Sequence, residues 1–377
     1  MRFRWIQFLG LIGILQASVQ AAVLPENRAD ALYHNYTGGG VEISGPSVLV
    51  RKKFGERFSA SFNYYVDNVS SASIDVVTTA SRYNEKRDEQ SARLDFLNQK
   101  TLMSVGLTKS TEKDFDASTV NVNFAQEFFG DLTTLTMGFA RGDNTVSRNG
   151  DAVFKDQSNA RNYRLSLTQI LSKNMIMALA FENISDQGYL NNPYRSVRYL
   201  DATQPTQYSF QSEVYPRTRD SDAFAVSVRY HLQPRAVLYG GYRFYSDSWA
   251  INANTFELGY VFPYRDKWIF DTSLRYYVQD HAEFYADLFP FRDAQNFLAR
   301  DKELSSFNSL SFGSGFSYAL ESLEWQKIKR GSLNLHLDYI QFNYDDFRDL
   351  TVSASPGNEP LYSFNATVIR AFASLWF

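Results

Sequence analysis

The chain contains 377 residues, and its 24 Tyr, 31 Phe and 5 Trp give an aromatic share of 16%, yet its mean hydropathy is −0.35 and its formal net charge −3. The lack of cysteine excludes disulfides and thiolate metal ligands, and the lack of a basic stripe argues against nucleic acid as a partner. No apolar run of about 18 residues follows residue 22, which excludes a helical membrane protein and favours a wall that is apolar on one face only.

The first segment, residues 1–22, has the pattern of a secretory signal peptide. Arg2 and Arg4 give it a positive start, residues 6–15 form a short apolar run, and small residues precede a cleavage point after position 21 or after Ala22. An uncleaved anchor helix is the alternative, but the run is too short to span a bilayer comfortably. We therefore expect export through a cleaved signal peptide.

From about residue 40 onward the hydrophobicity alternates with a period of two, which is typical of β-strands. The pattern is clearest in residues 58–67, 120–124, 224–232 and 268–278. The segments run to about ten to fourteen residues, longer than usual globular strands and long enough for tilted strands that cross a bilayer. We expect hydrocarbon outside this wall and water inside it.

The connections between these strands alternate in length. Short turns are expected near 54–57, 98–100, 129–131, 172–174, 233–235 and 263–266. Longer segments are expected near 70–87, 146–159, 187–219, 280–304 and 346–361. This alternation is typical of outer-membrane barrels, with short periplasmic turns and long extracellular loops.

The predicted fold is all-β: a transmembrane antiparallel up-and-down β-barrel that forms a single domain, residues 23–377, in the cell outer membrane. Fifteen strands are evident after Gly40, and an even number favours sixteen, with residues 31–37 as the first strand. Fourteen strands remain possible if residues 88–111 are loop. The inner connection 319–330 is long and charged, and is a candidate for a helical turn.

The last segment alternates up to the terminal aromatic residue. Its apolar face consists of Ile369, Ala371, Ala373, Leu375 and Phe377. A C-terminal aromatic on such a strand resembles the signal that the barrel assembly machinery recognises, so we expect that machinery and outer-membrane lipid as partners.

Six stretches across the mature chain carry a further resemblance. They are 45–52 (GPSVLVRK), 67–75 (DNVSSASID), 126–131 (QEFFGD), 192–195 (NPYR), 296–304 (NFLARDKEL) and 345–349 (DDFRD). In these stretches the chain resembles a family of Gram-negative outer-membrane β-barrel proteins recorded only as a domain of unknown function. Members of that family are often encoded near flavin-attaching and thioredoxin-like envelope proteins, so the resemblance implies an envelope redox context.

The polar face of the strands carries many ionisable groups, which must face inward because a charge facing lipid at mid-depth is unfavourable by about 2–4 kcal/mol. The predicted lumen residues are Arg93, Asp95, Glu127, Arg164, Glu182, Arg229, Arg243, Glu257, Asp271, Arg275, His336, Asp338 and Arg370. Either these groups brace the wall as ion pairs, or they line a pore and select solutes by charge. Both interpretations can hold together.

No motif for catalysis or for a metal is present. The four histidines form neither HxxxH nor HExxH, and the sequence contains no G-x-S-x-G elbow, phosphate loop or dinucleotide fingerprint. His336 and Asp338 share one strand face and could form a His–Asp pair, although a hydrogen-bonded lumen histidine is the simpler interpretation. We expect no enzyme activity, no catalytic residue, no metal and no cofactor.

Two long loops, 187–219 and 280–304, mix aromatic and charged residues, and long loops in compact folds are usually functional or disordered. Their candidate functional residues are Tyr194, Arg195, Arg198, Arg292, Asn296, Arg300 and Asp301. We expect these loops to fold over or into the mouth of the barrel.

The function predicted from the sequence is a porin-like channel or a barrel that handles a small solute in a charged lumen. The first alternative is a non-catalytic scaffold for an envelope redox or flavin-associated system. An outer-membrane enzyme, resting on His336 and Asp338 alone, is the weakest alternative.

Overall fold

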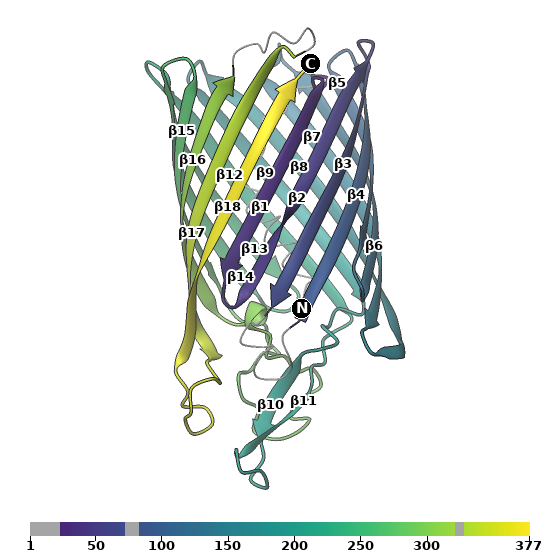
Figure 1. Ribbon diagram of the computed structural model, residues 1–377, viewed down its shortest axis with the longest axis vertical. Helices are drawn as coiled ribbons and strands as arrows, with labels where there is room; N and C mark the ends of the chain where they lie inside the picture. The colour runs from purple at the N-terminus through teal and green to yellow at the C-terminus, as the bar shows by residue number, and fades with distance from the viewer. Residues whose placement is uncertain (1–22, 72–82, 321–327) are drawn as a thin grey trace.

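The computed structural model describes residues 23–71, 83–320 and 328–377. The predicted signal peptide, residues 72–82 of a predicted long loop and residues 321–327 of the predicted helical turn lie outside this described part. Within it, sixteen strands form a closed antiparallel barrel, in the order β1-β18-β17-β16-β15-β14-β13-β12-β9-β8-β7-β6-β5-β4-β3-β2 (Figure 1). No helix in these ranges is long and apolar enough to cross a membrane.

The bounds of the elements are as follows. The first half of the barrel consists of β1 (Arg28–Gly38), β2 (Val41–Phe54), β3 (Phe58–Ser71), β4 (Tyr83–Asn98), β5 (Thr101–Thr111), β6 (Phe115–Phe128), β7 (Thr133–Arg148), β8 (Asp151–Ser172) and β9 (Met175–Gly188). The second half consists of β12 (Thr218–Leu232), β13 (Ala236–Asp247), β14 (Asn252–Tyr264), β15 (Trp268–Gln279), β16 (Phe307–Leu320), β17 (Arg330–Arg348) and β18 (Leu361–Trp376). Three elements are not part of the barrel wall: the two strands of a hairpin, β10 (Ser196–Leu200) and β11 (Tyr208–Ser212), and the short 3₁₀ helix η1 (Lys302–Leu304).

The predicted first strand closes the barrel. β1 pairs with β2 on one side and with β18 on the other, where Arg28 lies opposite Trp376 and Gly38 opposite Ala366. The turn that follows it contains Gly39 and Gly40 with φ of 56° and 76°, the left-handed conformation that a two-residue hairpin turn requires. Residues 88–111 belong to β4 and β5. The prediction of sixteen strands is therefore confirmed, and the alternative of fourteen strands is wrong.

The two ends of the barrel differ in their connections. All six predicted short turns are found at one end, here called the turn end, while the long loops gather at the opposite, long-loop end (Figure 1). The predicted loop at 146–159 is wrong: β7 and β8 continue through it and meet at a tight turn, Asn149–Gly150. Likewise residues 83–87 of the predicted loop 70–87 are strand. These strand ends lie beyond the apolar band. Both of their faces are polar there, so the alternation of apolar and polar residues that indicates a strand is absent.

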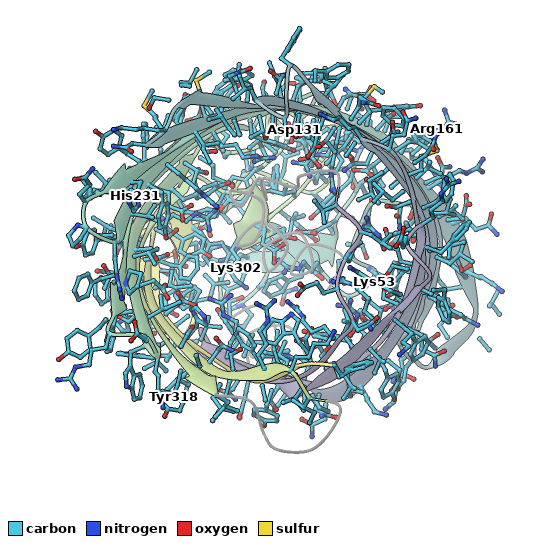
Figure 2. The ribbon with its side chains drawn as sticks, turned by 90° about the horizontal axis from the view of Figure 1, so that it is seen from above. Lys53, Asp131, Arg161, His231, Lys302 and Tyr318 are labelled. Atoms are coloured by element: carbon cyan, nitrogen blue, oxygen red, sulfur yellow. The ribbon has the colours of Figure 1, made fainter. Side chains whose placement is uncertain are left out.

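Alternation separates an outer face from an inner face. On β14 the side chains of Phe256, Leu258, Tyr260, Phe262 and Tyr264 are all exposed on the outside. Seen end-on, Lys53 lies inside the ring, whereas Arg161 and Tyr318 lie outside it (Figure 2). Similar exposed apolar rows on the other strands form a band that water would solvate poorly and lipid would cover.

The inner face is not polar throughout. Near the long-loop end, inward side chains of β1–β3 and β16–β18 form a buried apolar layer that includes Ile43, Phe307 and Phe342. The expectation of water along the whole interior is therefore wrong at this end, because aromatic side chains pointing inward fill the space between the strands.

Candidate functional site

The structure brings several of the predicted lumen charges together in pairs. All thirteen lie on inward strand positions, opposite in parity to the exposed apolar rows. The ion pairs, with N–O distances, are Arg93–Asp95 at 2.7 Å, Arg164–Glu182 at 2.8 Å, Arg243–Glu182 at 3.4 Å and Arg370–Asp338 at 2.8 Å. The bracing interpretation therefore accounts for seven of the thirteen.

Six of the predicted lumen residues line one cavity of about 570 Å³ inside the barrel. These six are Glu257, Asp271, Arg275, His336, Asp338 and Arg370. The cavity lies between strands β1–β3 and β13–β18, and its size is that of a small-ligand pocket. It is the candidate functional site, and we call it the lumen cavity.

A glycine on β16 decides how His336 is paired. In register, Gly315 lies between Asp271 on β15 and His336 on β17. A Cβ at Gly315 would lie 1.8 Å from Oδ2 of Asp271, so the Asp271 side chain crosses the space that this glycine leaves and comes within 3.9 Å of Nδ1 of His336. The alternative of a His336–Asp338 pair is wrong, since Asp338 instead accepts a hydrogen bond from Arg370.

The lumen cavity also contains residues that the sequence analysis missed. Arg28 and Asp30 form an ion pair at 2.8 Å, and Leu32, Leu49 and Phe372 give the cavity an apolar side. The ring of Phe372 is stacked on His336, with 5.8 Å between ring centroids. Alternation placed these residues inward, but only the closure of the barrel brings β1 and β2 beside β18.

The long-loop end is closed by a second charged region. We call residues 189–217, 280–306 and 349–360, together with the turn 248–251, the outer loop cluster. The first two segments are joined by isolated bridges, Tyr199 to Phe289 and Val214 to Leu298. Trp249 packs edge-on against Phe284, with ring centroids 5.1 Å apart, in a buried apolar core. The loops are therefore packed against one another rather than extended into solvent.

Arg198 of β10 is the most buried charge of this cluster, at 0% exposure. Its guanidinium donates to both carboxylate oxygens of Glu359, at 2.5 and 3.1 Å, and its Nε donates to the carbonyl of Asp287 at 2.9 Å. The Asp287 carboxylate is a further partner. Hydrogen bonds from Arg198 outweigh burial and hold the pKa of Glu359 below its usual value.

Two more predicted loop arginines join the same cluster. Arg300 binds the Asp287 carboxylate at 2.9 Å and donates to the backbone carbonyl of Arg348 at 3.0 Å. Arg195 forms an ion pair with Asp301, whose side chain also accepts from the backbone N–H of Glu303 at the start of η1. Three arginines are thus neutralised by carboxylates, and the pairs of Arg195 and Arg198 join different segments of the cluster.

Glu213 is the cluster carboxylate that holds a proton most readily. It is buried beside Asp301, and together burial and that neighbouring charge raise its pKa from 4.5 to about 7. The hydroxyl of Tyr215 donates to Glu213 at 2.6 Å, and the backbone N–H of Arg300 donates to it at 2.8 Å. This group was not predicted, because Arg300 and Asp301, which lie beside it, belong to a different loop.

The remaining loop candidates lie apart. The Tyr194 hydroxyl accepts from the backbone N–H of Asn149 at 2.6 Å, at the β7–β8 turn. Arg292 is exposed and pairs only loosely with Asp293, at 3.6 Å, and Asn296 is exposed. The structure therefore separates these three residues from the buried arginines.

The loop cluster extends across the mouth. Tyr194 contacts the β7–β8 turn, whereas Arg198 contacts the β17–β18 loop. β8 and β17 are seven positions apart in the ring of sixteen, so these contacts lie on nearly opposite sides. Lys302, which is buried in η1, lies near the centre of the ring when the barrel is viewed end-on (Figure 2). This confirms the expectation that the loops fold over the mouth.

A family model described as "Protein of unknown function (DUF3570)" matches residues 78–164 and 148–346 of the chain. No curated protein matches. Among solved structures, the chain is similar to a bacterial polysaccharide outer membrane secretin, with 7% identity, TM-score 0.49, and 94% of this chain and 100% of that chain covered. It is similar to OccK2 (OpdF) of Pseudomonas aeruginosa, with 12% identity, TM-score 0.44 and 95% and 100% covered. A FadL homologue of the same organism gives 10% identity, TM-score 0.42 and 94% and 91% covered.

Proposed function

This chain belongs to the DUF3570 family, proteins of unknown function, and we propose that it is a porin-like outer-membrane barrel that handles a small polar solute in its lumen. The observation that carries the proposal is the lumen cavity, lined by charged groups inside a closed sixteen-strand wall and lying beneath loops that cover one mouth. Such a barrel leaves room for a solute only where side chains and loops do not fill it. The outer loop cluster then acts as the gate.

Conductance in planar bilayers tests this proposal. We expect purified wild-type protein to open rarely, and Arg198→Ala to open more often, because the variant leaves Glu359 without its cation and removes one of the two cations of Asp287. Arg292→Ala is the matched control, since Arg292 is an exposed loop arginine outside the buried network. A membrane that stays electrically silent with all three proteins would contradict the channel proposal.

We further propose that the long-loop end is extracellular and that the chain reaches the outer membrane through a cleaved leader and the barrel assembly machinery. Support comes from the exposed apolar band and from β18, whose outward residues run from Ile369 to Leu375 and end beside Phe377. Deleting Phe377 should reduce the amount of folded barrel in the outer-membrane fraction. Unchanged assembly would remove the proposed role of this terminus.

We propose no catalytic role for the lumen. Within the described residues no serine or threonine hydroxyl hydrogen-bonds to His336, and Asp338 is engaged by Arg370. A histidine without a nucleophile lacks the geometry of acyl transfer. His336→Ala should therefore leave the envelope lipid and peptidoglycan composition unchanged, and an altered composition would favour the enzyme alternative.

A further inference from the structure

Two opposite charges of the lumen cavity face each other without forming an ion pair. Glu257 on β14 and Arg275 on β15 are direct cross-strand partners, and both line the cavity. Side chains in such positions have Cβ atoms about 4.5–5.5 Å apart, and opposite charges there usually bind each other. Yet within the described residues no salt bridge or side-chain hydrogen bond joins Glu257 to Arg275, and Nε of Arg275 is buried without a partner.

The other charged side chains of the cavity each lie near an opposite charge, although Nε of Arg370 is also buried without a hydrogen-bond partner. Arg370 binds Asp338, and Arg28 binds Asp30. His336 is near Asp271 and stacked on Phe372. Glu257 and Arg275 are therefore the anion and the cation of the cavity that form no ion pair in the described part of the chain.

One side of the cavity carries four apolar side chains, and uncharged polar side chains such as Ser47, Asn63 and Ser311 complete the lining. Leu32 and Leu49 approach from β1 and β2, and Ile340 and Phe372 approach from β17 and β18. These strands adjoin the polar strands through the closed ring, so one ligand can touch both sides. A ligand complementary to this surface has an ammonium and a carboxylate at one end and an apolar group at the other.

We propose that the lumen cavity binds a small zwitterion with an apolar side group, such as an apolar α-amino acid. Its ammonium group would lie at Glu257 and its carboxylate at Arg275. This inference rests on the proposed function and names the class of its solute. The guanidinium matches a carboxylate in a planar, bidentate fashion, and a carboxylate accepts from an ammonium. A ligand that carries both charges on one carbon satisfies both cross-strand partners at once.

Binding to the full-length mature barrel in detergent micelles, measured by isothermal titration calorimetry, tests the proposal. Three probes share one carbon skeleton: L-leucine carries both charges, 4-methylpentanoate lacks the ammonium and 3-methylbutylamine lacks the carboxylate. Because a hydrogen bond to a charged group is worth more than a neutral one, leucine should bind at least about tenfold more tightly than either analogue. Equal affinity for leucine and 4-methylpentanoate, or no leucine binding, would overturn the zwitterion site.

Variants separate the two ends of the ligand. Glu257→Gln should weaken leucine binding about tenfold without weakening 4-methylpentanoate, whereas Arg275→Gln should weaken both and leave 3-methylbutylamine unchanged. Glu127→Gln, a lumen carboxylate on β6 away from the cavity, is the matched control and should bind as wild type does. If either cavity variant keeps wild-type affinity for leucine, the assignment of that end is wrong.

Conductance keeps the two proposals distinguishable. A barrel that conducts but does not bind leucine refutes the zwitterion site and leaves the channel. A barrel that binds leucine with the predicted analogue pattern but never conducts refutes the channel and leaves the site.

Discussion

The lumen cavity and the outer loop cluster are both rich in charge, yet they hold it differently. Cavity groups such as Arg370 and Asp338 pair across neighbouring strands and remain partly exposed, and Glu257 and Arg275 stay unpaired. In the loop cluster, by contrast, Arg198 has no exposure and binds carboxylates from two other segments. The lumen therefore offers charge to a ligand, whereas the cluster uses its charge to hold loops together.

The largest expected effect comes from breaking the loop cluster at Arg198. Arg198→Ala should destabilise the cluster by about 3–5 kcal/mol, because it leaves Glu359 as an uncompensated buried charge, whereas Asp287 keeps Arg300. Hydrogen exchange of residues 189–217 and 349–360 should rise, while exchange of the barrel strands stays unchanged. Arg198→Lys is the control, because it keeps the positive charge but lacks the planar set of donors that a guanidinium offers. Faster exchange throughout the barrel wall would mean that the two regions are not separable.

A second difference is pH dependence, which we expect in the cluster. The pKa of Glu213 is raised from 4.5 to about 7, so the stability it contributes is complete below the unfolded pKa and is lost as pH rises through about 7. The loss is at most about 3 kcal/mol. The charged and polar groups that face Glu213 are Asp301, Arg195, the Tyr215 hydroxyl and the Arg300 N–H.

This pH dependence is measured as hydrogen exchange of the loop segments, corrected for intrinsic rates, at about pH 5 and about pH 8. Glu213→Gln should remove most of the difference. Loops that open as pH falls from 8 to 5 would show that the sign is wrong.

A smaller effect on stability is expected when a methyl group is added at a glycine in the wall of the lumen cavity. Gly315→Ala should destabilise the barrel by about 1–3 kcal/mol, because the new Cβ would displace Asp271 from its place beside His336. Denaturant unfolding followed by tryptophan fluorescence measures the change. Gly240→Ala is a matched control, since its Cβ would meet its nearest atom at 3.5 Å, an ordinary contact. Equal midpoints for both variants would argue that Asp271 can move without loss.

The smallest effect belongs to the exposed lumen charges. The side chain of Arg164 is 61% exposed and binds Glu182, so solvent screens the pair and Arg164→Gln should cost less than about 1 kcal/mol. Arg243 binds the same Glu182 at 3.4 Å, and its side chain is only 8% exposed. Arg243→Gln should therefore lower the free energy of unfolding more than Arg164→Gln does. If the two variants unfold at the same denaturant concentration, burial does not decide the strength of the lumen pairs.

The lumen charges were predictable because alternation forces them inward, and all thirteen lie there. Their partners were not predictable in the same way. The sequence left open a pair of His336 with Asp338 on its own strand, like the pair that Arg93 forms with Asp95, but Asp338 pairs across strands with Arg370. Gly315 then allowed Asp271 to reach His336 from two strands away.

For the candidate loop residues, too, the partners could not be predicted from the sequence. Arg195, Arg198, Arg300 and Asp301 form the buried ion pairs of the cluster, whereas Tyr194, Arg292 and Asn296 take no part in them, and the sequence does not distinguish the two groups. Their partners include Glu359, which is 161 positions from Arg198. No local pattern encodes a contact over such a separation.

The sequence by itself determined the class of the fold and the inward face of each strand, and it favoured sixteen strands over fourteen, because a period of two is a local property that lipid on one side imposes. Only the tertiary structure decided which charges neutralise one another, which remain available in the lumen cavity, and that loops cover the mouth. Those outcomes depend on strand register, on ring closure that sets β1 beside β18, and on contacts between distant loops, none of which alternation specifies.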